Sequence, residues 1–252
     1  MSAILRVAPT WMSGPAAGPA HRYDAALVTR LVYVRHGESN VTVDRVIGGH
    51  RTCTGLSELG RQQAAALRDR WLARPEFTPD LIIASHYPRA RETAAFVAQA
   101  FGDPPITIEE GFGEHDPGEE CDGMSMAAFV ERFGVDSWEM DPFGVTFPGG
   151  ETLAAFHYRV GAAVRSLLDR HAGATIVVVC HGGVIDAVLR QALKTIPTGG
   201  FLIHTLNTSI TELELVKPNT WRLHRYGDSA HLHGLPASTP SAKPLPDVPE
   251  GA

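Results

Sequence analysis

Short apolar runs alternate with longer amphipathic segments along the middle of the chain. The runs are rich in Val, Ile and Leu and end at Gly, Pro or charged residues, a pattern typical of buried β-strands. We predict four strands of this kind and two closing strands around a Lys-Pro-Asn turn. The four lie at 30–35, 80–85, 106–108 and 175–180, and the closing pair at 209–215 and 221–226.

The segments between these runs predict helices. Ser57 is suited to cap a helix over 57–71, whose apolar residues recur on one face. Further helices are predicted over 89–100, 151–171 and 181–193. Because strands that alternate with helices form a parallel sheet covered on both faces, we predict an α/β fold. It is a three-layer α/β/α sandwich around a mostly parallel mixed sheet.

Three segments do not follow this alternation. Residues 111–149 hold Gly, Pro and acidic residues around one helical piece at 124–132, and we interpret them as a small cap insertion. Residues 1–28 are rich in Ala, Gly and Pro, and 235–252 carry five prolines among small polar residues. Such compositions favour a flexible N-terminal extension and a Pro-rich C-terminal tail on a body spanning 29–234.

Composition narrows the class of protein. The formal net charge of −6 argues against a nucleic-acid partner and against an anionic membrane, since both call for a basic surface. No apolar stretch approaches the length that spans a bilayer, and the first 20 residues lack the pattern of a signal peptide. Three cysteines without a CxxC spacing indicate a reducing compartment, so we expect a cytoplasmic protein.

The residues that follow the predicted strands carry the chemistry. Arg35 and His36 end the first strand, Arg89 lies shortly after the second, and His181 ends the fourth. Ligands of α/β sheets bind at the carboxyl ends of the strands, so these side chains should converge. Arginine clamps phosphate oxygens, neutral imidazole is a nucleophile, and glycines such as Gly182 offer backbone N–H donors to an anion.

With these motifs in place, the chain resembles the histidine phosphatase superfamily, which includes the cofactor-dependent phosphoglycerate mutases. The resemblance covers about residues 30–234, and its five motifs occur in the expected order. RHG alone is a weak signal, whereas the full series is highly specific. The matching segments are LVYVRHGES at 31–39, LSELGRQQA at 56–64, SHYPRARETA at 85–94, PGGET at 148–152 with Arg159-Val160, and VVCHGG at 178–183.

The resemblance implies roles for the matching residues. His36 would be the phosphorylated nucleophile, and Arg35, Arg89 and His181 would bind the transferring phosphoryl group together with Gly182. These cationic donors would do the work of metal ions, so neither a metal nor a cofactor is expected. The family often has asparagine six residues after the nucleophile, where this chain has Thr42, a residue that can still donate a hydrogen bond.

The acid that protonates the leaving group is expected four residues before a glycine. Glu114 precedes Gly118 by that spacing, and Glu109 precedes Gly113 equally well. We favour Glu114, because Gly118 is followed by an acidic stretch, as the family pattern expects, and leave Glu109 open. Glu38 after the signature is as easily structural as functional. The pair His231 and His233 has the spacing of metal ligands but no third ligand nearby, so we expect it at the surface.

The leading hypothesis is a phosphoric monoester hydrolase of the histidine acid phosphatase type, acting on a small phosphorylated metabolite. One rival is an isomerase of the phosphoglycerate mutase type. Such mutases use extra basic residues to hold a bisphosphorylated intermediate, and between Glu114 and Gly150 the chain has only Arg132. The other rival is a phosphate-binding or partner-binding relative without turnover. Dimers are common among similar proteins, so a homodimer is a further expectation.

Overall fold

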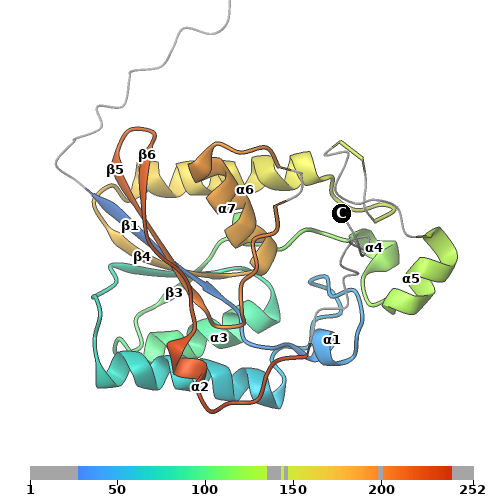
Figure 1. Ribbon diagram of the computed structural model, residues 1–252, viewed down its shortest axis with the longest axis horizontal. Coiled ribbons are helices and arrows are strands. Elements are labelled where there is room, and N and C mark those ends of the chain that lie inside the picture. Colours follow the sequence, from blue (N-terminus) through green and yellow to red (C-terminus); the bar gives the residue numbers. More distant parts are fainter. Residues whose placement is uncertain (1–27, 135–142, 145–146, 198–200, 240–252) are drawn as a thin grey trace, which may run out of the picture.

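The computed structural model describes residues 28–134, 143–144, 147–197 and 201–239. Its centre is one sheet of six strands in the order β3-β2-β4-β1-β5-β6 (Figure 1). The first four in this order are parallel, β5 runs antiparallel to β1, and β6 runs antiparallel to β5 and so in the direction of β1, which confirms the mostly parallel mixed sheet. The strands are β1 (Thr29–Arg35), β2 (Leu81–Ala84), β3 (Ile106–Ile108), β4 (Thr175–Cys180), β5 (Ile210–Lys217) and β6 (Thr220–Asp228).

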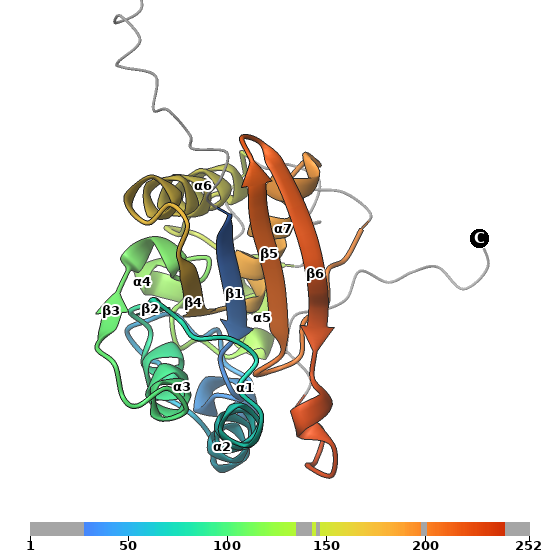
Figure 2. The same ribbon diagram turned by 90° about the vertical axis from the view of Figure 1, so that its left-hand side faces the viewer.

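Helices cover both faces of the sheet and complete the three layers. One face carries α2 (Glu58–Ala73) and α3 (Pro88–Gln99), and the other carries α6 (Leu153–Arg170) and α7 (Gly182–Leu193), as Figure 2 shows. Successive residues of a strand point to opposite faces. Thus Leu31 and Tyr33 belong to the core beneath α6 and α7, while Val32 and Val34 belong to the core beneath α2 and α3.

The helix boundaries follow local capping signals. The hydroxyl of Ser57 accepts a hydrogen bond from the backbone N–H of Gly60 at 3.0 Å, as predicted for the start of α2. The helix predicted from residue 89 begins one residue earlier, because Pro88 occupies the first helical position, where its missing N–H costs nothing. Thr152 caps α6, which begins at Leu153, two residues after the predicted start at 151.

A small cap lies at the end of the sheet where β1 ends (Figure 1). It comprises α4 (Gly118–Cys121) and α5 (Met126–Phe133), and the latter confirms the helical piece predicted there. The short helix α1 (Asn40–Val43), which the sequence pattern did not predict, lies beside it. The cap has its own apolar core of Ile47, Cys121, Phe129 and Phe147. Residues 135–142 and 145–146 of the predicted insertion lie outside the described residues.

The predicted extension 1–28 lies outside the described residues except for Val28, and so does the tail beyond Thr239. Residues 238 and 239 contact α2 and the segment after β1. Ser238 accepts a hydrogen bond from Nε2 of Gln63 at 2.8 Å, and the N–H of Thr239 donates to Glu38 at 2.7 Å.

His231 is less exposed than expected, because its side chain is partly buried. It belongs to a short 3-10 helix, η3 (Ala230–Leu232), that packs against α2, and its Nε2 lies 2.9 Å from the hydroxyl of Thr208. Burial, aided by the charge of Arg70, lowers the pKa of His231 to about 4. His233 is exposed as expected. Within the described ranges no three His, Cys, Asp or Glu side chains are grouped to hold a metal ion, and no helix there has the length and apolarity to cross a bilayer.

Candidate active site

The strand ends meet as the sequence predicted. Arg35 on β1 is paired with Cys180 on β4, so the residues that follow, His36 and His181, lie side by side. Their ring centroids are 5.1 Å apart. The N–H of Ser85 donates to the carbonyl of Val179 at 3.0 Å, which brings the end of β2 to the same edge. Three segments far apart in sequence therefore contribute to one site.

The protonation state of His36 follows from its hydrogen bonds. Its Nδ1 lies 2.7 Å from the carbonyl oxygen of Gly37, which can only accept, so Nδ1 carries the proton. Burial, together with the charges of Arg89 and Arg35, lowers the pKa of His36 well below its usual value and keeps the ring neutral. Nε2 is therefore unprotonated, and it accepts a hydrogen bond from Nε of Arg89 at 3.1 Å. A neutral imidazole with a free lone pair on Nε2 is a competent nucleophile.

Two arginines flank this nitrogen. Arg89 is buried, its guanidinium lies 4.5 Å from the ring centroid of Tyr87, and its Nη1 donates to the carbonyl of Gly48 at 3.2 Å. Arg35 donates from Nη1 to the carbonyl of Thr205. Its Nε is buried and has no hydrogen-bond partner among the described residues. Both arginines are thus held in position by backbone carbonyls.

His181 is fully buried behind His36. Its Nε2 lies 2.8 Å from the hydroxyl of Ser85, while its Nδ1 has no hydrogen-bond partner within the part of the chain that the structure describes. Burial, followed by the charge of Arg89, lowers the pKa of His181 well below its usual value. The next residue, Gly182, opens α7, and a Cβ added there would lie 3.7 Å from Nε of Arg35. A side chain at this position would pack directly against that nitrogen.

The structure separates the two glutamates that the spacing rule could not. Glu114 lines the pocket beside His36, whereas Glu109 forms an ion pair with Arg170 at 2.7 Å on the outer face of α6. Oε2 of Glu114 accepts from the N–H of Gly183 at 3.0 Å, and Oε1 accepts from the N–H of His115 at 3.0 Å. The carboxyl group is therefore positioned by backbone donors from two segments.

Arg159 holds the backbone on which Glu114 sits, a function that the sequence did not predict. Its Nη1 donates to the carbonyls of Gly111 and Gly113, both at 3.1 Å, and its Nη2 donates to the carbonyl of Glu114 at 3.3 Å. Glu151 pairs with the same guanidinium at 2.7 Å. The resemblance included Arg159 only as part of a motif. Its hydrogen bonds to the backbone of residues 111–114, in a distant segment of the chain, have no local sequence signal.

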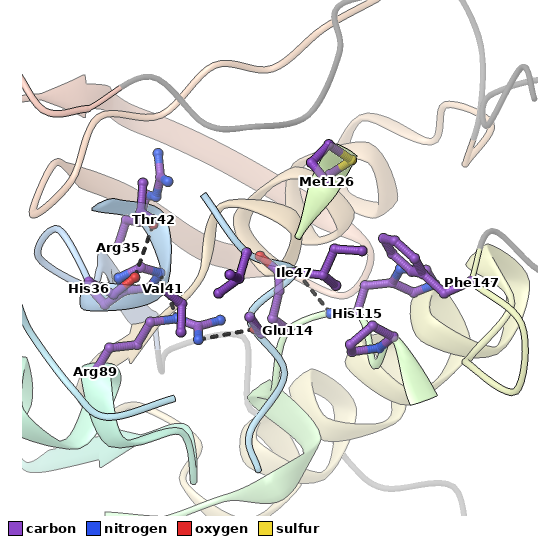
Figure 3. Close-up of a pocket in the computed structure, with 14 residues that line it drawn as sticks. Arg35, His36, Val41, Thr42, Ile47, Arg89, Glu114, His115, Met126 and Phe147 are labelled. Atoms are coloured by element: carbon purple, nitrogen blue, oxygen red, sulfur yellow. Dashed lines mark hydrogen bonds between the residues drawn. The ribbon is translucent and has the colours of Figure 1, made fainter. Parts of the chain in front are cut away.

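These residues surround a cavity of about 140 Å³. Figure 3 shows His36, Arg35 and Arg89 on one side and Met126 and Phe147 on the other, with Glu114 between them. Thr42 lines the cavity as expected, and its hydroxyl lies 3.0 Å from that of Ser39. The apolar side was not predicted, because its members come from three separate segments.

Two neighbouring side chains have structural contacts. Glu38 is buried and accepts from the hydroxyl of Ser57 at 2.7 Å and from the N–H of Thr239, so it ties the signature loop to α2 and to the tail. His86 packs against Tyr87 with ring centroids 4.8 Å apart. Tyr87 in turn lies 4.7 Å from the ring of His181 and beneath Arg89, which makes it a packing platform that the sequence reading missed.

The comparisons with known proteins agree with this geometry. The family model of the histidine phosphatase superfamily (branch 1) matches residues 31–229. Phosphoglycerate mutase-like protein 4 of Arabidopsis thaliana is 30% identical, over 84% of this chain and 91% of the relative. The metal-independent phosphoserine phosphatase of the same plant is 26% identical, over 82% and 85%.

Solved structures give the same result. YhfR of Bacillus stearothermophilus has a TM-score of 0.71 at 28% identity, covering 81% of this chain and 99% of that one. A mycobacterial glucosyl-3-phosphoglycerate phosphatase has a TM-score of 0.66 at 27% identity, covering 79% and 98%. With the fold, the order of motifs and the relatives in agreement, the chain belongs to the histidine phosphatase superfamily and is a phosphatase of that superfamily.

Proposed function

We propose that the protein is a metal-independent phosphoric monoester hydrolase, of the histidine acid phosphatase type, that works through a phosphohistidine at His36. One observation carries this proposal. Nε2 of His36 is unprotonated, and beside it Nε of Arg35 and Nδ1 of His181 are buried without partners among the described residues. We assign the hydroxyl of Ser85 as the donor to Nε2 of His181, so that Nδ1 carries the proton and both unpartnered nitrogens are donors. A buried unsatisfied donor costs about 1–3 kcal/mol, so both would gain from an anionic ligand.

The first half of the reaction follows from this arrangement. Nε2 of His36 attacks phosphorus, and the bond from phosphorus to the leaving oxygen breaks. Arg35, Arg89 and His181 stabilise the negative charge that spreads over the phosphoryl oxygens. Glu114, protonated at this stage, gives its proton to the leaving oxygen, so the leaving group departs as an alcohol and Glu114 is left as a carboxylate. General acid help of this kind is worth about 10² to 10⁴ in rate.

The second half regenerates the enzyme. Water attacks the phosphoryl group, the P–N bond to His36 breaks, and the carboxylate of Glu114 takes the proton that water releases. Inorganic phosphate leaves, and both residues return to their initial states. Thr42, which lines the cavity, and the N–H of Gly182, the residue after His181, would be additional hydrogen-bond donors to the phosphoryl group.

The charges of the cap support a hydrolase over a mutase. The only arginine between Glu114 and Gly150 is Arg132, which is largely exposed and paired with Glu120. It does not line the cavity. A mutase needs cationic groups for a second phosphoryl group, so we retain the isomerase as the alternative with less support. Several relatives are named as phosphatases, including the phosphoserine phosphatase, which supports a small phosphorylated metabolite as the substrate.

The test is hydrolysis of p-nitrophenyl phosphate with EDTA present, combined with trapping of the phosphorylated protein. His36→Asn preserves a donor toward the carbonyl of Gly37 while removing Nε2, and His233→Asn is the matched control at an exposed histidine. We expect turnover and an acid-labile phosphoryl label on His36 in the wild type and control, and neither in His36→Asn. Unchanged turnover in His36→Asn would refute the mechanism. Phosphate binding without any label would favour a non-catalytic relative.

We make three further proposals, on the domain boundaries, the compartment and the oligomeric state. We propose a catalytic domain spanning 29–234, with its cap at 111–149, since the family model covers most of that range. Cys53, Cys121 and Cys180 are all free and buried, which supports a reducing compartment, and we propose the cytoplasm. A homodimer stays a prediction from the resemblance.

A further inference from the structure

The cavity has two chemically different sides. The side that holds His36 carries the cationic donors. The rest of the lining is largely apolar, and we define its five apolar side chains, Val41, Val46, Ile47, Met126 and Phe147, as the apolar wall; His115 lies beside Phe147. Figure 3 shows Met126 and Phe147 farthest from His36, with Ile47 and Glu114 between them. A phosphate ester bound at His36 would therefore direct its leaving group past Glu114 onto this wall.

The wall is preformed by pairing between the loop after α1 and the cap. The N–H of Ile47 donates to the carbonyl of Met124 at 2.8 Å, and the N–H of Gly123 returns a bond to Ile47 at 2.8 Å. Val46 forms an isolated bridge with Ser125. Phe147 lies within the cap core, 5.3 Å from the ring of Phe129. A wall fixed in this way can select a leaving group by shape and polarity.

The described arginines at and near the cavity either flank His36 or are paired with carboxylates. Arg35 and Arg89 are the only lysine or arginine side chains among its described lining residues, and both flank His36. The remaining titratable base in the lining is His115, whose Nε2 lies 2.6 Å from the carbonyl oxygen of Glu151. Farther out, Arg51 faces Asp116 and Asp122, each at 3.7 Å, and Arg159 is paired with Glu151. A carboxylate on the leaving group would thus meet the carboxyl group of Glu114 and the apolar wall. Moving such a charge out of water without a partner is strongly unfavourable.

We infer that this site takes phosphate monoesters whose leaving group is uncharged and partly apolar, and that it discriminates against leaving groups that carry a carboxylate. The inference rests on the proposed function, since it concerns the leaving group of the same reaction. It assigns substrate selection to the wall and leaves the phosphoryl chemistry to His36 and its donors.

A matched pair of substrates tests this directly. Glycerol 3-phosphate and 3-phosphoglycerate share one carbon skeleton and differ in a hydroxymethyl group against a carboxylate. We expect kcat/KM to favour glycerol 3-phosphate on the order of 100-fold, because the carboxylate loses its hydration without gaining a cation. Along the series ethyl, propyl and butyl phosphate, kcat/KM should rise about threefold to fourfold per methylene, as burial against the wall increases.

A pair of charge variants ties the preference to the wall. Met126→Lys places a cation on the wall, and Ala127→Lys places the same charge at the next residue of α5, which is exposed and outside the lining. Met126→Lys should narrow the preference for glycerol 3-phosphate at least tenfold and flatten the alkyl series, while Ala127→Lys should leave both unchanged.

The outcomes separate the two proposals. Equal or faster turnover of 3-phosphoglycerate, with p-nitrophenyl phosphate still hydrolysed through His36, would overturn the substrate class and leave the mechanism standing. An alkyl series without any rise would overturn the role of the wall in the same way. Absence of His36-dependent turnover on every ester, including p-nitrophenyl phosphate, would refute the proposed function and this inference with it.

Discussion

Substitution of Gly183 by alanine should displace the proposed acid without touching the nucleophile. A Cβ at this position would lie 2.2 Å from Oε1 of Glu114, closer than the 3.0 Å below which real Cβ atoms essentially never approach another heavy atom. The atom in conflict is the end of a flexible side chain, so the carboxyl group can withdraw by roughly 1 Å. Gly183 lies in α7 without a positive φ, and alanine is compatible with its backbone.

The expected loss depends on how much the leaving group needs a proton. A misplacement of about 1 Å can cost about 10²-fold in rate, and general acid catalysis as a whole contributes about 10² to 10⁴. For an alkyl phosphate, whose alkoxide is a poor leaving group, we expect kcat to fall about 10²-fold in Gly183→Ala. For p-nitrophenyl phosphate, whose phenolate leaves readily, the loss should stay below about tenfold. The assay is steady-state hydrolysis of both esters, with thermal unfolding measured in parallel.

A double-mutant cycle with Glu114→Ala isolates the cause. Once the carboxyl group is gone, Gly183→Ala has nothing to displace, so it should add no further loss in that background. The melting temperature should not fall, because alanine inside a helix is favoured over glycine by about 0.5–1 kcal/mol. Equal losses on both esters, or full additivity of the two substitutions, would refute the assignment of Glu114 as the acid held by Gly183.

Three further outcomes are expected. Thr239→Pro removes the N–H that donates to buried Glu38, so it should lower the unfolding free energy by about 1–3 kcal/mol in urea titrations, while Thr239→Ala keeps that donor and should not. Arg159→Lys loses the planar fork that binds the backbone around Glu114; kcat on alkyl phosphates should fall about tenfold or more with little change in KM. The pKa of His231 is lowered to about 4, so between about pH 6.5 and 4 the unfolded state binds a proton that the folded state does not. The unfolding free energy should therefore fall as the pH falls through this range, by up to about 1.4 kcal/mol per pH unit. The urea midpoint of His231→Gln should fall less steeply over the same range.

The strands, and the chemically active residues at their carboxyl ends, could be predicted because their sequence signals are local. The run at 175–180 coincides with β4, since a strand buried on both faces is a continuous apolar run. His36 and His181 follow two such runs, and the parallel pairing of β1 with β4 brings them together. Knowledge of the sheet class was therefore sufficient to expect two histidines and two arginines at one edge.

The acid shows where local reasoning ends. Glu109 and Glu114 satisfy the same spacing to a following glycine, so the pattern alone left both open. They are separated by what each meets in space. Glu109 follows directly on β3, where Arg170 of α6 pairs with it. Glu114 lies farther along the chain, at the N-terminal end of α7, where the N–H of Gly183 donates to it. The residues between Glu109 and Glu114 carry no signal that says which glutamate will lie near Arg170 and which near the N-terminal end of α7.

The remaining contacts of the site are invisible to sequence for a related reason: they use the backbone. Arg159 donates to four carbonyl oxygens, and Thr239 offers an N–H that any residue but proline would offer. Such groups occur at every position, so their use depends on the fold and not on the side chain. The same holds for the donors that support catalysis, because Nη1 of Arg35 is engaged by the carbonyl of Thr205 while its Nε has no partner among the described residues. Sequence can identify an arginine that suits phosphate, but only the fold determines which of its N–H groups is left for the substrate.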